Sequence, residues 1–125
     1  MDDELPKYSL TIIEFPEYLE ARVKAETISE EIIAAYVREI ADASNASGKG
    51  RILLYRDIPM VLSGGSVFHT VAASLELLRG KKIALVNPYA EIDAEIGFGM
   101  TVGQNRGGDY ANFRTVEDAK AWLLK

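Results

Sequence analysis

Short continuous apolar runs mark the buried strands of this chain. The segments 51–56 and 82–87 each carry four consecutive apolar residues at their centre, which is typical of strands covered on both faces of a parallel sheet. Pro88 ends the second of them, since proline cannot continue a hydrogen-bonded ladder. A shorter segment at 109–113 predicts a last strand, preceded by the turn-forming residues 105–108.

Two further strands are predicted near the N-terminus. Residues 8–15 are rich in β-branched and aromatic side chains, and Pro16-Glu17 separates them from an alternating segment at 18–24. The connection is short enough for the two strands to pair as an antiparallel hairpin. The alternation predicts one buried face on the second strand and one solvent-exposed face, formed by Tyr18, Glu20, Arg22 and Lys24.

Apolar positions at helical spacing predict four helices. The first begins near Thr27 or Ser29, either of which can cap it, and it ends in the polar loop 45–50. Gly80 is placed to end the second helix in the left-handed conformation. The remaining helices are expected over about 66–79, about 91–104 and from Thr115 onward. The order ββαβαβαβα indicates an α/β fold in one domain, residues 1–125.

Composition and charge narrow the function classes. Hydrophobic residues make up 48% and charged residues 26%, as in ordinary globular domains. The absence of cysteine excludes disulfides and thiolate chemistry. The net charge of −5 disfavours nucleic-acid binding, which needs a basic patch. The acidic N-terminus is no signal peptide and no apolar run reaches the length of a membrane span, so we expect a cytoplasmic protein.

The loop that follows the strand at 51–56 is the strongest candidate for a functional surface. In open α/β sheets, loops at the carboxyl ends of strands are where ligands and partners usually bind. Ser66 fits the role of helix cap, and a hydroxyl at a helix N-terminus can also present a phosphate to free backbone N–H groups. The residues expected to contact a partner are Asp57, Ser63, Gly64, Gly65, Ser66 and His69.

Catalytic chemistry finds little support in the sequence. His69 could act as a base for Ser63 or Ser66 with Asp57 as orienting acid, but the chain lacks the tight G-x-S-x-G elbow. The glycines in 97–103 fall within a helical pattern, where they allow close packing and do not form a dinucleotide fingerprint. We therefore expect a protein that is not an enzyme.

Metal and anion sites are also poorly supported. The acidic residues Glu91, Asp93 and Glu95 fit a solvated helix face, and the chain has one histidine and no cysteine, so neither a metal nor a cofactor is expected. Arg106 could bind an anion, although it also suits a helix C-terminus, where a cation complements the dipole.

Several segments together resemble one known family. The strand-loop-helix at 51–79, the run Arg79-Gly-Lys-Lys-Ile-Ala-Leu-Val86, the turn Asn105-Arg-Gly-Gly and the end Phe113-Arg-Thr-Val-Glu-Asp-Ala-Lys-Ala-Trp-Leu are similar to STAS-like domains. These include bacterial anti-sigma-factor antagonists and uncharacterised single-domain relatives. The resemblance implies a mixed sheet of four or five strands with about four helices, and a binding module.

The resemblance also bears on regulation. In the regulatory members, a serine or threonine in the loop before the second helix is phosphorylated by a partner kinase, and the matching position is Ser63 or Ser66. Those members carry an Asp-Ser-Ser/Thr-Gly motif. This chain has Leu62-Ser-Gly-Gly-Ser66, without the aspartate, which fits the uncharacterised branch better.

Two functions follow as expectations. The first is a regulatory module that docks an unknown protein partner, or a second copy of itself as a homodimer, through residues 57–70. The alternative is a binding protein for a small apolar ligand or lipid, with a pocket between sheet and helices lined by Phe68, Tyr89 and Phe98.

Overall fold

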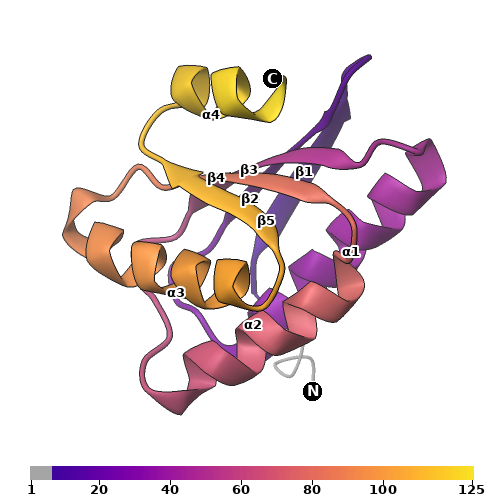
Figure 1. Ribbon diagram of the computed structural model, residues 1–125. Helices are drawn as coiled ribbons and strands as arrows, with labels where there is room; N and C mark the ends of the chain where they lie inside the picture. The colour runs from indigo at the N-terminus through magenta and orange to yellow at the C-terminus, as the bar shows by residue number, and fades with distance from the viewer. Residues whose placement is uncertain (1–6) are drawn as a thin grey trace.

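Five strands form one mixed sheet whose order in space follows their order along the chain, β1-β2-β3-β4-β5. The computed structural model describes residues 7–125 (Figure 1). The antiparallel pair formed by β1 and β2 confirms the predicted N-terminal hairpin, and the other three pairings are parallel. The strands are β1 (Ser9–Glu14), β2 (Leu19–Lys24), β3 (Arg51–Asp57), β4 (Lys82–Val86) and β5 (Asp109–Phe113).

The helices cover the two faces of the sheet unequally (Figure 1). Helices α1, α2 and α3 lie on one face, and the short α4 lies alone on the other. The order of elements agrees with the predicted α/β fold. The helices are α1 (Glu30–Ser47), α2 (Gly65–Leu77), the 3₁₀ turn η2 (Ala90–Ile92), α3 (Asp93–Asn105) and α4 (Val116–Leu123).

Local signals set several of the helix ends. Ser29 caps α1, since its hydroxyl oxygen accepts a hydrogen bond from the backbone N–H of Ile32 at 3.1 Å. Thr115 caps α4 in the same way, with Asp118 as the donor. Gly80 adopts φ of +79° just beyond α2, the left-handed conformation expected for it.

One prediction about the strand segment 18–24 is wrong in part. Arg22 and Lys24 are exposed as expected, but Glu20 and Tyr18, which directly precedes β2, are buried. Tyr18 packs in the cluster that α4 forms over the sheet, together with Ala119 and Leu123. Glu20 accepts a hydrogen bond from Arg22 at 2.6 Å, which compensates the burial of its charge. The alternating pattern identifies two faces of the strand correctly, but it does not reveal that a helix covers the second one.

Candidate functional site

The candidate loop joins β3 to α2, and its geometry differs from the expectation at the helix start. Gly64 is the N-cap residue, with φ of +61° and no side-chain cap. Ser66 is therefore the second residue of α2 and does not cap it. Glycine accepts a positive φ without steric cost, so the chain can enter the helix two residues earlier than a Ser66 cap would require.

Ser66 and His69 instead share a partner on α1. The Nδ1 atom of His69 lies 3.1 Å from Oε1 of Glu30. The Ser66 hydroxyl, and after it His69, favour the ionised carboxylate and lower the pKa of Glu30. The serine hydroxyl thus faces a carboxylate, an arrangement that ties α2 to α1. The sequence offers no sign of this partner, because a glutamate in the first turn of a helix is already explained by its favourable interaction with the helix dipole.

This contact gives a titration prediction. We expect the Ser66→Ala variant to raise the pKa of Glu30, because the hydroxyl that favours the ionised carboxylate is lost. A folded-state pKa below the unfolded value adds stability that is present above the unfolded pKa and lost as pH falls through the folded pKa. The carboxyl carbon shift of Glu30, followed by NMR between pH 2 and 7, measures the change. Ser63→Ala is the control and should leave the Glu30 titration as it is.

Asp57 has a different partner from the serines and the histidine. The hydroxyl of Tyr89 donates a hydrogen bond to the Asp57 carboxylate at 2.5 Å, and this raises the pKa of Tyr89. Asp57 thereby holds the loop that leads from β4 to α3. With Asp57 bonded to Tyr89 and His69 to Glu30, these contacts do not build a serine–histidine–aspartate triad.

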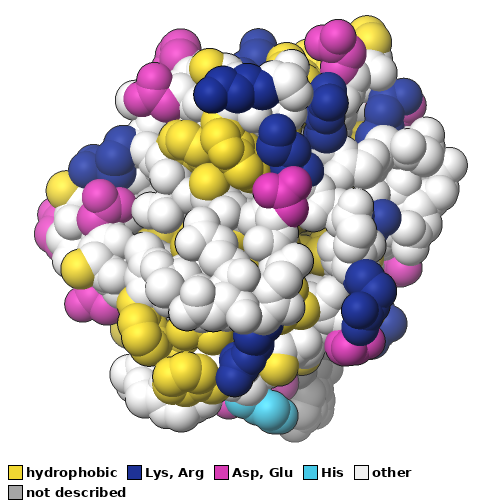
Figure 2. Space-filling model, in the orientation of Figure 1, with side chains coloured by type: hydrophobic (Ala, Val, Ile, Leu, Met, Phe, Trp, Pro, Cys, Tyr) yellow, Lys and Arg dark blue, Asp and Glu magenta, His cyan; other side chains and the backbone are white. Residues whose placement is uncertain are grey.

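Two exposed phenylalanines form a patch beside the loop. Phe68 of α2 and Phe98 of α3 are 45% and 49% exposed, and their rings pack edge to face with centroids 5.7 Å apart. The guanidinium of Arg106 lies 5.8 Å from the centre of the Phe68 ring. Figure 2 shows hydrophobic side chains gathered over these helices, with a basic side chain and the histidine nearby. We call Phe68, Phe98 and Arg106 the aromatic patch.

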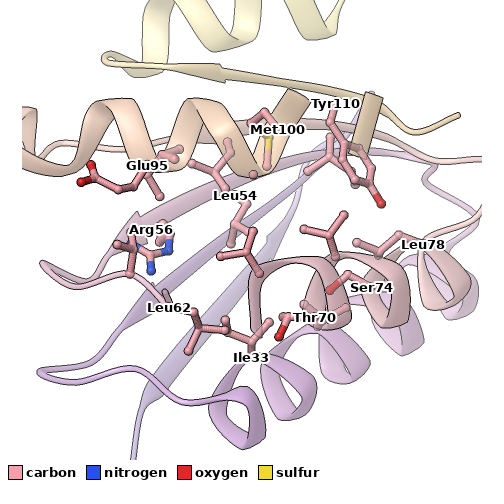
Figure 3. Close-up of a pocket in the computed structure, with 18 of the residues that line it drawn as sticks. Ile33, Leu54, Arg56, Leu62, Thr70, Ser74, Leu78, Glu95, Met100 and Tyr110 are labelled. Carbon is pink, nitrogen blue, oxygen red and sulfur yellow. The ribbon is translucent and has the colours of Figure 1, made fainter. Parts of the chain in front are cut away.

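A cavity of about 160 Å³ lies on the other side of the loop, between the sheet and helices α1, α2 and α3 (Figure 3). Most of its wall is aliphatic. Part of the wall comes from Val61 and Leu62, so the inner side of the candidate loop closes one side of the cavity. Other wall residues come from β3, α2 and α3 and include Leu54, Val71, Ile96 and Met100.

The three aromatic residues expected to line such a pocket do not line this one. Val67 and Val71 take the inward positions of α2, which directs Phe68 to the surface. Phe98 lies on the outward side of α3, whereas Ile96 and Met100 line the cavity. The side chain of Tyr89 is bonded to Asp57 instead. The lining is aliphatic because the inward helix positions carry branched residues and methionine.

Polar groups interrupt the aliphatic wall at a few points. Arg56 is only 4% exposed, and it donates to the backbone oxygens of Ile58 at 2.9 Å and Met60 at 2.6 Å. Burial lowers the pKa of Arg56, and the neighbouring Tyr36 opposes that effect. No carboxylate among residues 7–125 forms an ion pair with it within 4.0 Å.

Two hydroxyls in the same wall lack hydrogen-bond partners within the part of the chain that the structure describes. They belong to Thr70 of α2 and Tyr110 of β5, and both oxygens are buried. Burial raises the pKa of Tyr110 to about 12. The Tyr110 ring is held tightly, since a Cβ atom on Gly103 would lie 2.7 Å from its Cδ2 atom. At that position the expectation of close packing by the helix glycines is confirmed.

No group of three or more histidine or acidic side chains is placed to hold a metal ion in residues 7–125. None of the helices described between α1 and α4 has the length and hydrophobicity to cross a membrane.

Comparison with known proteins identifies the fold. No protein-family model and no curated protein matches the sequence. The solved structure of an anti-sigma factor antagonist from Mycobacterium paratuberculosis matches with a TM-score of 0.59 at 13% identity, covering 95% of this chain and 96% of that one. An uncharacterized protein with a SpoIIAA-like fold from Shewanella loihica matches with a TM-score of 0.53 at 17% identity, covering 98% of both chains. The five-stranded mixed sheet with its four helices is therefore a STAS-like domain fold.

Proposed function

We propose that this chain is a non-enzymatic regulatory module that docks a partner protein. The docking surface consists of residues 57–70 together with the aromatic patch. The observation that carries the proposal is the patch itself, two half-exposed phenylalanine rings in edge contact beside an arginine. Phenylalanine, like the other aromatic residues, and arginine are enriched at the cores of protein interfaces.

The fold supports the same class of function. One of the two solved structures of similar fold is that of an anti-sigma factor antagonist, a regulator by its description. In this chain the residues expected to contact a partner lie on the β3–α2 connection and the first turns of α2, which is continuous with Phe68. A partner at this surface would therefore touch the expected segment and the patch together.

The patch favours a different protein as its partner over a second copy of the chain. Arg106 forms no ion pair among residues 7–125, so a partner can supply a carboxylate to it. A symmetric dimer presents the same surface from both sides. In such a dimer the aromatic patches of the two copies would face each other. Arg106 of each copy would then find no carboxylate in the opposing patch, which consists of Phe68, Phe98 and Arg106. We therefore propose a partner with an apolar recess and an acidic residue at its edge.

Modification of the loop would act on this surface through Ser63. Its side chain is exposed, so a phosphate there would add roughly −1.5 to −2 charge to the docking surface without displacing an internal contact. A phosphate on Ser66 would instead meet the Glu30 carboxylate and disturb the contact between α1 and α2. We propose Ser63 as the modified residue if the surface is regulated in this way.

The test is loss of binding in matched variants. Cross-linking in cells of the source organism identifies a candidate partner, which is then purified and titrated by calorimetry against each variant. We expect Phe68→Ala with Phe98→Ala to weaken binding by about thirtyfold or more, as for interface hot spots. Ser63→Asp should also weaken binding. The control is Ile13→Ala, which removes an exposed apolar side chain of similar exposure from β1, far along the sheet order from the patch.

Two results would contradict the proposal. One is a purified partner that binds the double phenylalanine variant as tightly as the unchanged chain. The other is a concentration-dependent dimer in analytical ultracentrifugation that the double variant abolishes, because the surface would then pair two copies of the chain.

A further inference from the structure

The cavity combines a buried cation with unpaired hydroxyls. Its lining also includes the Glu95 carboxylate, which forms no ion pair with Arg56 within 4.0 Å. Arg56 enters its wall from β3, Thr70 from α2 and Tyr110 from β5. Figure 3 shows Arg56 at one end of the cavity and the hydroxyl of Tyr110 directed toward α2 at the other, with Thr70 below them. Tyr110 is only 7% exposed, and neither hydroxyl has a partner among residues 7–125. Buried polar groups are nearly always hydrogen-bonded, so two hydroxyls without hydrogen-bond partners in one cavity wall need an explanation.

The fold accounts for only part of the Arg56 side chain. A guanidinium carries five N–H donors, and the backbone oxygens of Ile58 and Met60 receive hydrogen bonds from its two terminal nitrogens. Those bonds fix the loop after β3, and the neighbouring Tyr36 offsets part of the effect of burial on Arg56. Neither the carbonyls nor the tyrosine hydroxyl carries the full negative charge that would pair with the guanidinium. Charges in protein interiors are usually paired, because moving a charged group out of water without an oppositely charged partner costs free energy. The remaining donors could therefore receive an anion.

The size and polarity of the cavity define what fits. Its volume of about 160 Å³ is close to the ~150 Å³ of an engineered apolar cavity that takes up benzene. A full-length lipid chain is too large for this space. The aliphatic wall excludes a highly charged anion such as free phosphate, which would have to lose its water against leucine and valine side chains.

We propose that this cavity binds a small carboxylic acid whose apolar body is about the size of a single aromatic ring. The carboxylate lies against Arg56, where planar guanidinium and carboxylate groups can form paired hydrogen bonds. The apolar body contacts the aliphatic wall, and a polar substituent on it can bond with Thr70 or Tyr110. The site is separate from the aromatic patch, so it stands whether or not the patch docks a protein.

The first experiment compares acids with their neutral amides on the unchanged protein. The probes are benzoate, 4-hydroxybenzoate and hexanoate, each paired with the corresponding amide. A ligand that binds only the folded chain raises the melting temperature by mass action. We expect the acids to raise it more than the amides at equal concentration, and to bind at least tenfold more tightly by calorimetry. Backbone NMR shifts should change around Arg56, Thr70 and Tyr110.

Three results would overturn the proposal. They are no change in melting temperature or NMR spectrum with any probe, equal affinity for acids and amides, and shifts confined to surface residues such as Arg106. Equal affinity would mean that the apolar wall alone attracts the probe and that Arg56 plays no part.

Variants that remove the two cavity hydroxyls test the site without destabilising the fold. Tyr110→Phe and Thr70→Val remove buried hydroxyls without hydrogen-bond partners, so the melting temperature of the free protein should stay equal or rise. Together the two substitutions should weaken the binding of 4-hydroxybenzoate severalfold more than the binding of benzoate. An unchanged ratio of the two affinities would contradict the role given to the hydroxyls.

The Arg56→Met variant tests the guanidinium. It should abolish the preference for acid over amide, and a folded variant that keeps the preference would contradict the role of the guanidinium. Ile13→Ala, on the edge strand β1 and outside the cavity, is the control and should bind every probe as the unchanged chain does.

Discussion

Replacing Leu53 with alanine is expected to lower the free energy of unfolding by about 2–5 kcal/mol, the range for buried leucine truncations. Leu53 is fully buried on the central strand β3, and it packs with Val86 and Leu123 in the cluster that joins α4 to the sheet. That cluster is small and its helix has only eight residues. Because few neighbouring side chains can move into the space left behind, we expect a value in the upper half of the range.

Urea unfolding followed by circular dichroism measures this loss. Ile13→Ala serves as the control, since Ile13 is 41% exposed on the edge strand β1 and its truncation should change the free energy by roughly 0.5 kcal/mol or less. A Leu53→Ala variant within about 1 kcal/mol of the unchanged chain would be below the range for buried leucines, and would mean that α4 does not pack on β3 as described.

Asn87→Asp is expected to lower the free energy of unfolding by about 3 kcal/mol at neutral pH, because buried groups would lose their hydrogen-bond partners. Asn87 is fully buried just after β4. Its side-chain amide donates to the backbone oxygen of Tyr89 at 2.9 Å and to the Asp93 carboxylate at 3.1 Å, and its oxygen accepts from the Tyr89 N–H at 3.1 Å. A carboxylate keeps the acceptor but cannot donate, and it would face Asp93 with like charge.

The same variant gives a pH dependence with a definite sign. Burial and the nearby Asp93 charge should raise the folded-state pKa of the introduced carboxyl above its unfolded value. The protonated form, which can donate, therefore contributes stability below the unfolded pKa, and this contribution is lost as pH rises through the folded pKa. Relative to the unchanged chain, the deficit should grow between pH 4 and 7. Adding Asp93→Asn should recover part of the stability, and a deficit that stays flat across this range would contradict the explanation.

Asn87 also matters for the candidate site. It fixes the segment that carries Tyr89, and Tyr89 in turn bonds Asp57 at the end of β3. The candidate loop is thus held from two sides, by this chain of contacts and by the bonds from Arg56 to the oxygens of Ile58 and Met60. Its outer side adjoins the aromatic patch and its inner side closes the cavity. The two proposed functions therefore use opposite sides of one segment.

The fold could be predicted from local patterns because each pattern reflects a local physical requirement. Four consecutive apolar residues at 52–55 and 83–86 favour strands covered on both faces, and both segments form interior strands of the sheet. A two-residue break at Pro16-Glu17 leaves little choice but an antiparallel hairpin. Helical stretches between later strands provide the long connections that parallel pairing needs.

The position of the candidate loop could be predicted for the same reason, but its contacts could not. Where a strand ends and a helix begins follows from residues near one another in sequence. The partner of Ser66 and His69 is Glu30, more than thirty positions away, and nothing in the spacing of polar residues identifies it. Likewise, the burial of Tyr18 depends on α4, which begins about a hundred residues later.

The cavity is the clearest case of what tertiary structure alone decides. The spacing of apolar residues within one helix or strand shows which of its faces points inward. A cavity, however, is the space left where the inward faces of several elements meet. Arg56, Thr70 and Tyr110 belong to three different elements, and none stands out in sequence as a binding residue. Phe68 and Phe98 stand out, yet they lie on the outer faces of their helices. The sequence by itself determined the order, type and pairing of the elements, because these depend on local burial and chain length. Packing between distant elements decided which polar groups became buried and unpaired.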